Sequence, residues 1–353
     1  MEDIFESSRV DEFPQIFDAF DNPLELYGLP EENLQLRNFE RLPQSLIALL
    51  PQYEELGRRS VGGRLRFQTD AESFLVQYQL ATETLDIAMA LPAAAGMDVY
   101  DGIAWESKYL GYIAPSEYGY KNKVISKIFT KSKGLSQVTI NLPRNERLSK
   151  LTVSFPDGAR VEAPKPYQKD GQIVFYGSSI TEGGCAPRPG CAYTSLVCRW
   201  LDVDYMNLGF SGGARGDLEC ASYIGQLNTT RVFVMDYDHN APSADFLEKT
   251  HWPFYERVRS LKPNLPIVLM SRPDFYENKE EDIRRLHVIE KTFKKAKSKG
   301  DNLVYFLDGS TIFCANSKEE STIDGCHPNA LGFFQMAQKL MPILESILED
   351  DLP

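Results

Sequence analysis

The sequence has little cysteine and histidine and no long hydrophobic run. Its 353 residues include only six cysteines and four histidines. All six cysteines lie in the second half: Cys185, Cys191, Cys198, Cys220, Cys314 and Cys326. They lack the pair-of-pairs spacing of a structural zinc site. Cys185 and Cys191 flank a proline-containing loop and could pair in an oxidising compartment, but we expect all six to be free thiols in a reducing one.

Basic residues are also in deficit. The chain has 38 lysines and arginines against 50 acidic residues, a formal net charge of -12. Nucleic acid and anionic membranes repel such a chain, so neither is an expected partner. No stretch approaches the length of a membrane span, and the acidic residues 1–7 lack the basic region and apolar core of a signal peptide. We therefore expect a cytoplasmic protein, or a secreted one if a leader precedes this sequence.

The first half of the chain carries short, strand-like runs separated by turns rich in glycine and proline. The runs are 45–50, 65–67, 73–80, 84–89, 124–129, 137–142 and 150–155. Many short strands with little helical periodicity predict a β-sandwich, and we expect a jelly roll. Pro164 and Pro166 lie in a polar segment that suits a stiff linker. The predicted domains are residues 1–166 and 167–353.

In the second half, apolar strand-like runs alternate with helical patterns. The predicted strands are 173–176, 204–208, 231–236, 266–271 and 303–307, and the longest predicted helices are 280–297 and 330–348. This alternation predicts an α/β/α domain with a five-stranded parallel sheet covered on both faces, as in flavodoxin-like folds. In such sheets ligands bind at the carboxyl ends of the strands.

One such strand end carries a candidate nucleophile. Residues 173–176 are apolar, and they run into Gly177, Ser178, Ser179 and a glycine-rich turn before a helical pattern. Ser179 is the predicted nucleophile, although a serine at a strand-to-helix turn can also serve as a helix N-cap. Ser178 is expected to make local backbone hydrogen bonds.

A matching acid and base lie near the C-terminus. Asp324 and His327 are three residues apart, so Asp324 can accept a hydrogen bond from one imidazole nitrogen while the other faces a serine. Cys326 is adjacent to His327, which could suggest a Cys/His nucleophile. Neighbouring side chains point apart, however, so we do not expect Cys326 to have that role. Two further strand exits, 205–213 and 232–242, carry glycine and asparagine.

The order serine, glycine, asparagine, Asp-x-x-His resembles the SGNH (GDSL-type) hydrolase superfamily over the second half of the chain. The resemblance implies that Ser179, His327 and Asp324 form a catalytic triad. It also implies that Ser179, Gly212 and Asn240 form the oxyanion hole. The sequence departs from the family in having serine at 178, where aspartate is common, and in the residues that precede Asn240.

A second resemblance concerns the first half. Residues 96–102 are similar to the Gly-x-Asp-Leu-Tyr signature of a β-domain that precedes certain SGNH esterases, including two-domain carbohydrate esterases. It makes Asp98 and Tyr100 candidate substrate-binding residues. The alternative is that Asp98 caps a turn and Tyr100 fills the core. Five aromatic residues could stack on a sugar or pack in the interior: Trp105, Tyr109, Tyr112, Tyr118 and Tyr120.

Together these features predict a serine esterase. The resemblance implies a small acyl substrate, acetyl above all, on a carbohydrate, with no cofactor and no metal. A lipase or thioesterase for longer chains and a non-catalytic glycan-binding protein are the alternatives. A metal-dependent phosphoesterase using Asp236, Asp238 and His239 is a third. The expected partner is a small-molecule or oligosaccharide ester, and the oligomeric state is left open.

Overall fold

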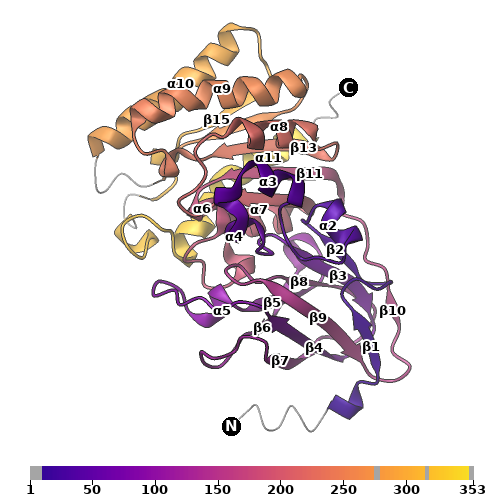
Figure 1. Ribbon diagram of the computed structural model, residues 1–353. Helices are drawn as coiled ribbons and strands as arrows, with labels where there is room; N and C mark the ends of the chain where they lie inside the picture. Colours follow the sequence, from indigo (N-terminus) through magenta and orange to yellow (C-terminus); the bar gives the residue numbers. More distant parts are fainter. Residues whose placement is uncertain (1–9, 274–278, 315–317, 350–353) are drawn as a thin grey trace. The chain divides into compact units, whose positions relative to one another are not determined.

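The chain folds into two compact units, each assembled from non-contiguous segments. The computed structural model describes residues 10–273, 279–314 and 318–349 (Figure 1). The first unit contains residues up to Pro43, Gly57–Tyr167 and Pro187–Gly190, and the second contains Gln44–Leu56, Gln168–Ala186 and the chain from Cys191 onward. Within the described ranges no helix combines the length and the apolar character that a membrane span requires.

The observed division differs from a single boundary between residues 166 and 167. The main change of unit, between Tyr167 and Gln168, lies one residue away, but residues 44–56 and 187–190 each pack with the unit formed mainly by the other half of the sequence. The sequence predicts a strand of the sandwich at residues 45–50, but the structure has helix α3 (Gln44–Leu49) there. Leu46, Ile47 and Leu50 are buried and lie on one helical face, which explains why a strand was wrong there.

The first unit is a β-sandwich with jelly-roll strand order. One antiparallel sheet has the order β1-β9-β4-β7, and the other contains β3-β8-β5-β6 and is extended by β2 and β10, which both pair with β3. The strands are β1 (Gln15–Asp18), β2 (Glu25–Tyr27), β3 (Arg64–Thr69), β4 (Ser73–Leu80), β5 (Met97–Asp101), β6 (Lys108–Ile113), β7 (Val124–Thr130), β8 (Ser136–Asn141), β9 (Leu148–Phe155) and β10 (Val161–Glu162). The prediction of a jelly-roll sandwich is confirmed. Residues 84–89 form no strand.

Alternating residues of the two sheets fill the sandwich core. Phe67 of β3 packs edge-on against Phe74 of β4 and Phe155 of β9. All three rings are fully buried, and each contributes on the order of 2 kcal/mol by leaving water. The short helix η1 (Val10–Glu12) precedes β1, and α2 (Glu31–Gln35), α5 (Leu91–Ala94) and η3 (Ala104–Glu106) connect strands. Between β2 and β3 the chain also forms η2 (Pro51–Tyr53) and α4 (Glu54–Gly57), and residues 44–56 pack with the second unit.

The second unit is an α/β/α layer structure around a parallel sheet. Its five strands follow the order β12-β11-β13-β14-β15, with bounds β11 (Lys169–Gly177), β12 (Val203–Gly209), β13 (Thr230–Asp236), β14 (Ile267–Met270) and β15 (Val304–Leu307). The helices that follow β11 in the chain are α6 (Ser179–Glu182), η4 (Pro189–Cys191), α7 (Tyr193–Leu201), α8 (Leu218–Gln226), η5 (Asp238–Asn240), α9 (Ala244–Leu261), α10 (Lys279–Ser298), η6 (Gly309–Thr311), η7 (Glu319–Ser321) and α11 (Ala330–Glu349). Pro189 and Gly190 of η4 pack with the first unit, whereas α3 and η2 of segment 44–56 belong to the second. The predicted five-stranded parallel sheet is confirmed.

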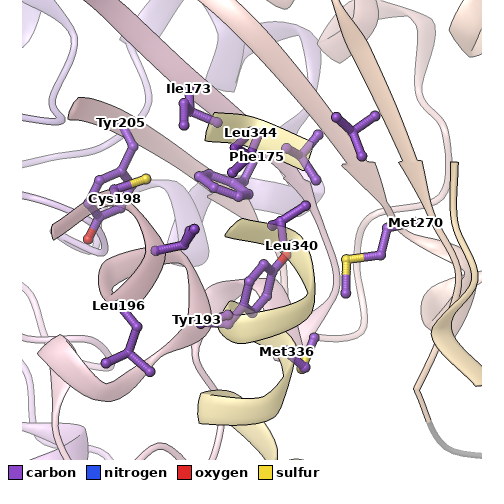
Figure 2. Close-up of a cluster of buried hydrophobic side chains, with 14 of the residues drawn as sticks. Ile173, Phe175, Tyr193, Leu196, Cys198, Tyr205, Met270, Met336, Leu340 and Leu344 are labelled. Atoms are coloured by element: carbon purple, nitrogen blue, oxygen red, sulfur yellow. The ribbon is translucent and has the colours of Figure 1, made fainter. Parts of the chain in front are cut away.

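Both faces of this sheet are apolar. On one face Phe175 packs with Tyr193 of α7 and Leu340 of α11 (Figure 2). On the other face Tyr176 and Phe233 pack against Phe254 of α9. Side chains alternate along a strand, so consecutive residues of β11 serve opposite layers, and residues 173–177 are all buried.

Strand β11 is the point at which the strand order reverses. The chain leaves β11 to form β12 on one side and returns to form β13 on the other. The three strands end level with one another, because Gly177 is in register with Gly209 of β12 and with Asp236 of β13. Loops that leave these ends are therefore neighbours, which is the usual position of a ligand site in an open α/β sheet.

Candidate active site

A tight turn after β11 presents Ser179. A Cβ on Gly177 would lie 2.0 Å from the Thr181 Oγ1 and 2.2 Å from the Asp236 carbonyl, so only glycine permits this turn. Ser178 is buried and caps α6, because its Oγ accepts a hydrogen bond from the Ile180 N–H at 3.1 Å. Ser179 is thus left as the first residue of the helix, where a backbone N–H has no acceptor within the helix.

The Asp324–His327 turn forms a compact hydrogen-bonded unit. One Asp324 oxygen accepts from the backbone N–H groups of Cys326 and His327, at 3.0 and 2.7 Å. The other lies 2.7 Å from the His327 Nδ1. Gly325, with φ of +83°, allows the chain to fold back so tightly. Partial burial alone raises the pKa of Asp324, but the hydrogen bonds from His327 and Cys326 outweigh it, so the pKa is lowered and the carboxylate stays ionised.

Ser179 and His327 meet although 148 positions separate them. The Ser179 Oγ lies 2.9 Å from the His327 Nε2. With Asp324 accepting the Nδ1 proton, the lone pair of Nε2 faces the serine hydroxyl. The structure therefore brings the three predicted triad residues together, with His327 hydrogen-bonded between Ser179 and Asp324.

The turn formed by residues 210–213 follows β12 and is referred to below as the Gly212 turn. Its Phe210 N–H donates to the Gly177 carbonyl, and its Gly213 N–H donates to the Phe210 carbonyl. The Ser211 N–H donates to Glu182 at 2.8 Å. All four residues of this turn are described by the structure, and Gly212 is the one whose backbone N–H has no acceptor among the described residues. Gly212 is exposed with φ of +68°, so this donor is accessible.

Asn240 lies beside the Gly212 turn. Its Nδ2 donates to the Phe210 carbonyl at 2.7 Å, which leaves the second amide hydrogen for another acceptor. It does not cap the next helix, because Ser243 does so by accepting from the Phe246 N–H. The predicted oxyanion residues Gly212 and Asn240 therefore occupy adjacent positions.

Asp98 and Tyr100 of β5 have partners within the first unit. The Asp98 carboxylate is fully buried and accepts from the Gly190 N–H and from Asn141 Nδ2 at 2.8 Å. The Arg188 guanidinium lies 3.5 Å from Asp98 and 3.2 Å from the Tyr100 hydroxyl. Asp98 thus fixes the segment 187–190, as the structural alternative predicts, and substrate contact by these two residues stays a prediction.

Other sequence candidates have separate environments. Asp236 accepts from the Tyr193 hydroxyl at 2.8 Å, and Asp238 accepts from the Arg272 N–H at 3.0 Å. The Cys326 sulfur lies 3.8 Å from the His239 Nδ1, so it faces His239. Within the described part of the chain no group of three or more metal-binding side chains occurs. All six cysteines are free thiols.

The aromatic residues noted in the sequence divide into two classes. Trp105, Tyr109, Tyr112 and Tyr118 are exposed, whereas Tyr120 is buried and its hydroxyl donates to Glu146. The Arg188 guanidinium lies 3.9 Å from the centre of the Tyr109 ring. Packing thus accounts for Tyr120, whereas the other four rings are partly exposed and that of Tyr109 is covered on one side by Arg188.

Two residues near the site were not found by sequence reasoning. Glu182 is buried on α6, three residues after Ser179, and bonds to Ser211 of the Gly212 turn. Tyr53 comes from the first half of the chain, and its ring stacks on Phe210. Proximity to Ser179 could have pointed to Glu182, but no local signal marks Tyr53.

Family models match both parts of the chain. The model of the GDSL-like lipase/acylhydrolase family matches residues 170–345, and the model of the N-terminus of SGNH-hydrolase-type esterases, named GxDLY, matches residues 18–161. A search of curated proteins finds no match.

Solved structures share the fold over nearly the whole chain. One described as a GDSL-like lipase from Bacteroides ovatus has a TM-score of 0.83 and 23% identity, covering 95% of this chain and 98% of that one. A salicylyl-acyltransferase from a tetracycline biosynthetic pathway has a TM-score of 0.73 and 18% identity, covering 96% and 99%. A family two carbohydrate esterase from Cellvibrio japonicus has a TM-score of 0.60 and 14% identity, covering 95% and 98%. At these identities the likeness shows a shared fold alone.

Proposed function

Because this chain belongs to the GDSL-like lipase/acylhydrolase family of SGNH hydrolases, with an N-terminal GxDLY domain, we propose that it is a serine esterase acting on small acyl esters of carbohydrates. The observation that carries the proposal is the continuous hydrogen-bonded line from Ser179 Oγ to His327 Nε2 and from His327 Nδ1 to Asp324, at 2.9 and 2.7 Å. Acetyl is the proposed acyl group.

In the first half-reaction, His327 takes the Ser179 proton as the Ser179 oxygen attacks the ester carbonyl. Asp324 stabilises the imidazolium that forms. The carbonyl oxygen becomes an oxyanion, for which the donors are the N–H groups of Ser179 and Gly212 and the second amide hydrogen of Asn240. His327 then gives its proton to the leaving alcohol, the C–O bond breaks, and an acyl-enzyme on Ser179 remains.

In the second half-reaction water takes the place of the alcohol. His327 removes a proton from water, and the resulting oxygen attacks the acyl carbonyl. The same donors stabilise the second oxyanion, and His327 returns the proton to Ser179 as the carboxylic acid leaves. No step requires a metal or an organic cofactor, because the nucleophile, base and oxyanion donors are all protein groups.

The substrate class rests on likeness of architecture. Among proteins of the same two-part fold is one named as an acetyl xylan esterase, from Butyrivibrio proteoclasticus, with a TM-score of 0.60 and 11% identity, covering 95% of this chain and 99% of that one. Exposed rings on the first unit, such as Trp105 and Tyr118, are of the kind that stack on sugars. Both observations support an acylated carbohydrate as the substrate.

The test is hydrolysis of aryl acetate, butyrate and octanoate by the wild type and by Ser179→Ala, with a chelator present. We expect acetate to have the highest kcat/KM and the variant to lose at least about 10⁴-fold in kcat. The matched control is Ser178→Ala, which removes a helix cap beside the nucleophile and should retain activity while lowering stability by about 1 kcal/mol.

Other results would select the alternatives. A preference for octanoate would indicate a lipase or thioesterase and contradict the small-acyl proposal. An inactive wild type that still binds glycans would indicate a binding protein. Hydrolysis of an aryl phosphate that survives Ser179→Ala but disappears when the chelator is added would indicate the metal-dependent phosphoesterase chemistry of Asp236, Asp238 and His239.

A further inference from the structure

The Gly212 turn is held from two sides by residues that take no part in the proposed chemistry. One is Glu182, on the nucleophile helix. The other is Tyr53, from the segment 44–56 that the first half of the chain contributes to the α/β unit. We propose that Tyr53 and Glu182 are positioning residues that fix the Gly212 N–H as an oxyanion donor, an inference that rests on the proposed esterase function.

The contact of Glu182 is with Ser211. Its carboxylate is buried and accepts both the Ser211 N–H, at 2.8 Å, and the Ser211 hydroxyl. Helix α6 also lies against the end of β12, since a Cβ on Gly209 would be 2.2 Å from the Glu182 nitrogen. Ser179 and the Gly212 turn are thereby tied to one short helix. The Ser211 N–H is also occupied, so it cannot compete with that of Gly212.

The contact of Tyr53 is with the other side of the turn. Its ring stacks on Phe210 with centroids 4.4 Å apart and planes 7° apart. Its single hydroxyl hydrogen is shared between two acceptors, the Gly213 carbonyl at 2.8 Å and the Asp217 carboxylate. A Cβ on Gly213 would be 2.7 Å from the Tyr53 ring, so the turn and the ring fit closely. Burial raises the pKa of Tyr53, and the neighbouring Asp217 carboxylate raises it further, so the phenol stays neutral and can donate a hydrogen bond.

These contacts matter because residues 211–213 have little packing of their own. Phe210 is fully buried, but Ser211 and Gly213 are half-buried and Gly212 is exposed, so this part of the turn buries little apolar surface. Further bonds to the turn run from Phe210 to Gly177 and from Asn240 to Phe210, and the Arg215 guanidinium lies 3.4 Å from the Gly212 carbonyl. An oxyanion donor works only if it is already in place, and a displacement on the order of 1 Å can cost about a hundredfold in rate.

The structure supplies a matched control for Tyr53. Tyr255 of α9 is also buried, and its hydroxyl also bonds to a carboxylate, that of Asp301. Asp301 precedes the start of β15, whereas the active site lies at the ends of the strands. The two tyrosines therefore have similar chemical surroundings, but Tyr53 lies near the carboxyl ends of the strands and Tyr255 near their amino ends.

The experiment compares Tyr53→Phe, Glu182→Ala and Tyr255→Phe in the full chain. We expect kcat for aryl acetate to fall about tenfold in Tyr53→Phe and about a hundredfold in Glu182→Ala, with KM within about twofold of the wild type. Affinity for a boronic acid, which forms a tetrahedral anion on serine, should fall in proportion to kcat. Tyr255→Phe should lower Tm as much as Tyr53→Phe but leave kcat and boronate affinity unchanged.

Conservative replacement separates positioning from bulk packing. Glu182→Gln keeps an oxygen that can accept from Ser211, so it should recover most of the kcat that Glu182→Ala loses. If Tyr53→Phe and Glu182→Ala lower only Tm, as Tyr255→Phe does, the positioning role is wrong. An inactive wild type would instead overturn the esterase proposal. Hydrogen exchange at residues 210–213 would then still test whether the two residues hold the turn, and unchanged exchange in both variants would refute that as well.

Discussion

Asp98 in the β-sandwich and Asp324 in the α/β unit are both carboxylates in recognisable sequence motifs, but their surroundings differ. Asp98 is fully buried, and its oxygens face donors from Asn141, Gly190 and Arg188. Asp324 has a side chain that is 44% exposed, and its partner His327 presents a nitrogen to Ser179. We call Asp98 a closed group, because it is buried and its oxygens face protein donors, and Asp324 an open group, because it is partly exposed and its partner faces the nucleophile. A closed group stabilises the fold, whereas an open group can take part in a reaction.

The largest test of this comparison is Asp324→Asn. An amide at this position can donate to the His327 Nδ1 and thereby favour the tautomer that carries its proton on Nε2, facing Ser179. We expect kcat to fall by about 10² to 10⁴-fold, with unfolding by urea changed by less than about 1 kcal/mol because the site is exposed. A large loss of stability with little loss of kcat would place Asp324 with the closed groups.

Asn240→Ala tests a second residue of the proposed active site, the amide donor of the oxyanion hole. The change removes one amide donor and the bond to the Phe210 carbonyl. Oxyanion donors contribute about 3 to 4 kcal/mol, so kcat should fall about 10² to 10³-fold at nearly constant KM. Steady-state kinetics with aryl acetate measure this, and Asn329→Ala, which alters another asparagine of the same unit at the start of α11, is the control. A kcat within threefold of the wild type would remove Asn240 from the oxyanion hole.

Asp98→Asn makes the same chemical change on the closed side. In either orientation the new NH₂ group faces a donor, Asn141 or Arg188, so a buried hydrogen bond is lost. We expect a loss of about 2 to 3 kcal/mol in the free energy of unfolding, measured with urea. kcat and KM per folded molecule should change little. A raised KM with unchanged stability would favour the substrate-binding role predicted for Asp98.

The smallest effect concerns a pair of histidines. His251 is buried, with its Nδ1 2.8 Å from the Thr292 Oγ1, and burial lowers its pKa from 6.5 to about 3. The unfolded chain therefore binds a proton more readily, so stability present above pH 6.5 is lost as pH falls toward 3. The loss is about 2 kcal/mol at pH 5.

Urea unfolding at pH 7 and pH 5 measures this loss. His251→Gln should reduce the difference between the two pH values, and what remains includes His239, whose pKa burial also lowers. His287→Gln, at an exposed position of α10, is the control and should leave the difference unchanged. An identical pH dependence in the wild type and in His251→Gln would show that burial of His251 does not cause the loss of stability at pH 5.

Local patterns predicted most of the architecture. Strand β4 was predicted at its observed bounds, and the five parallel strands and the helices α10 and α11 were placed within a few residues. These elements have strong periodicity or continuous apolar runs, and nearby residues determine both. The run 45–50 was misassigned because a six-residue apolar pattern fits a strand and a helix equally well.

The candidate site divides in the same way. Ser179 lies at a strand-to-helix turn, and Asp324 and His327 lie three residues apart, so short-range spacing was enough to select them. Glu182, by contrast, reaches Ser211 across 29 positions, and Tyr53 reaches Gly213 across 160. No periodicity relates such pairs, because each depends on where the chain returns after folding.

By itself, then, the sequence determined the strand and helix pattern, the two-part architecture and the identities of serine, histidine and aspartate, since each depends on residues close together in the chain. Tertiary structure decided the assembly of the site. It placed segment 44–56 in the α/β unit, closed Asp98 among its donors and left Asp324 open. The physical reason is that hydrogen bonds and ring contacts are made in space, after strand register has brought distant loops level with one another.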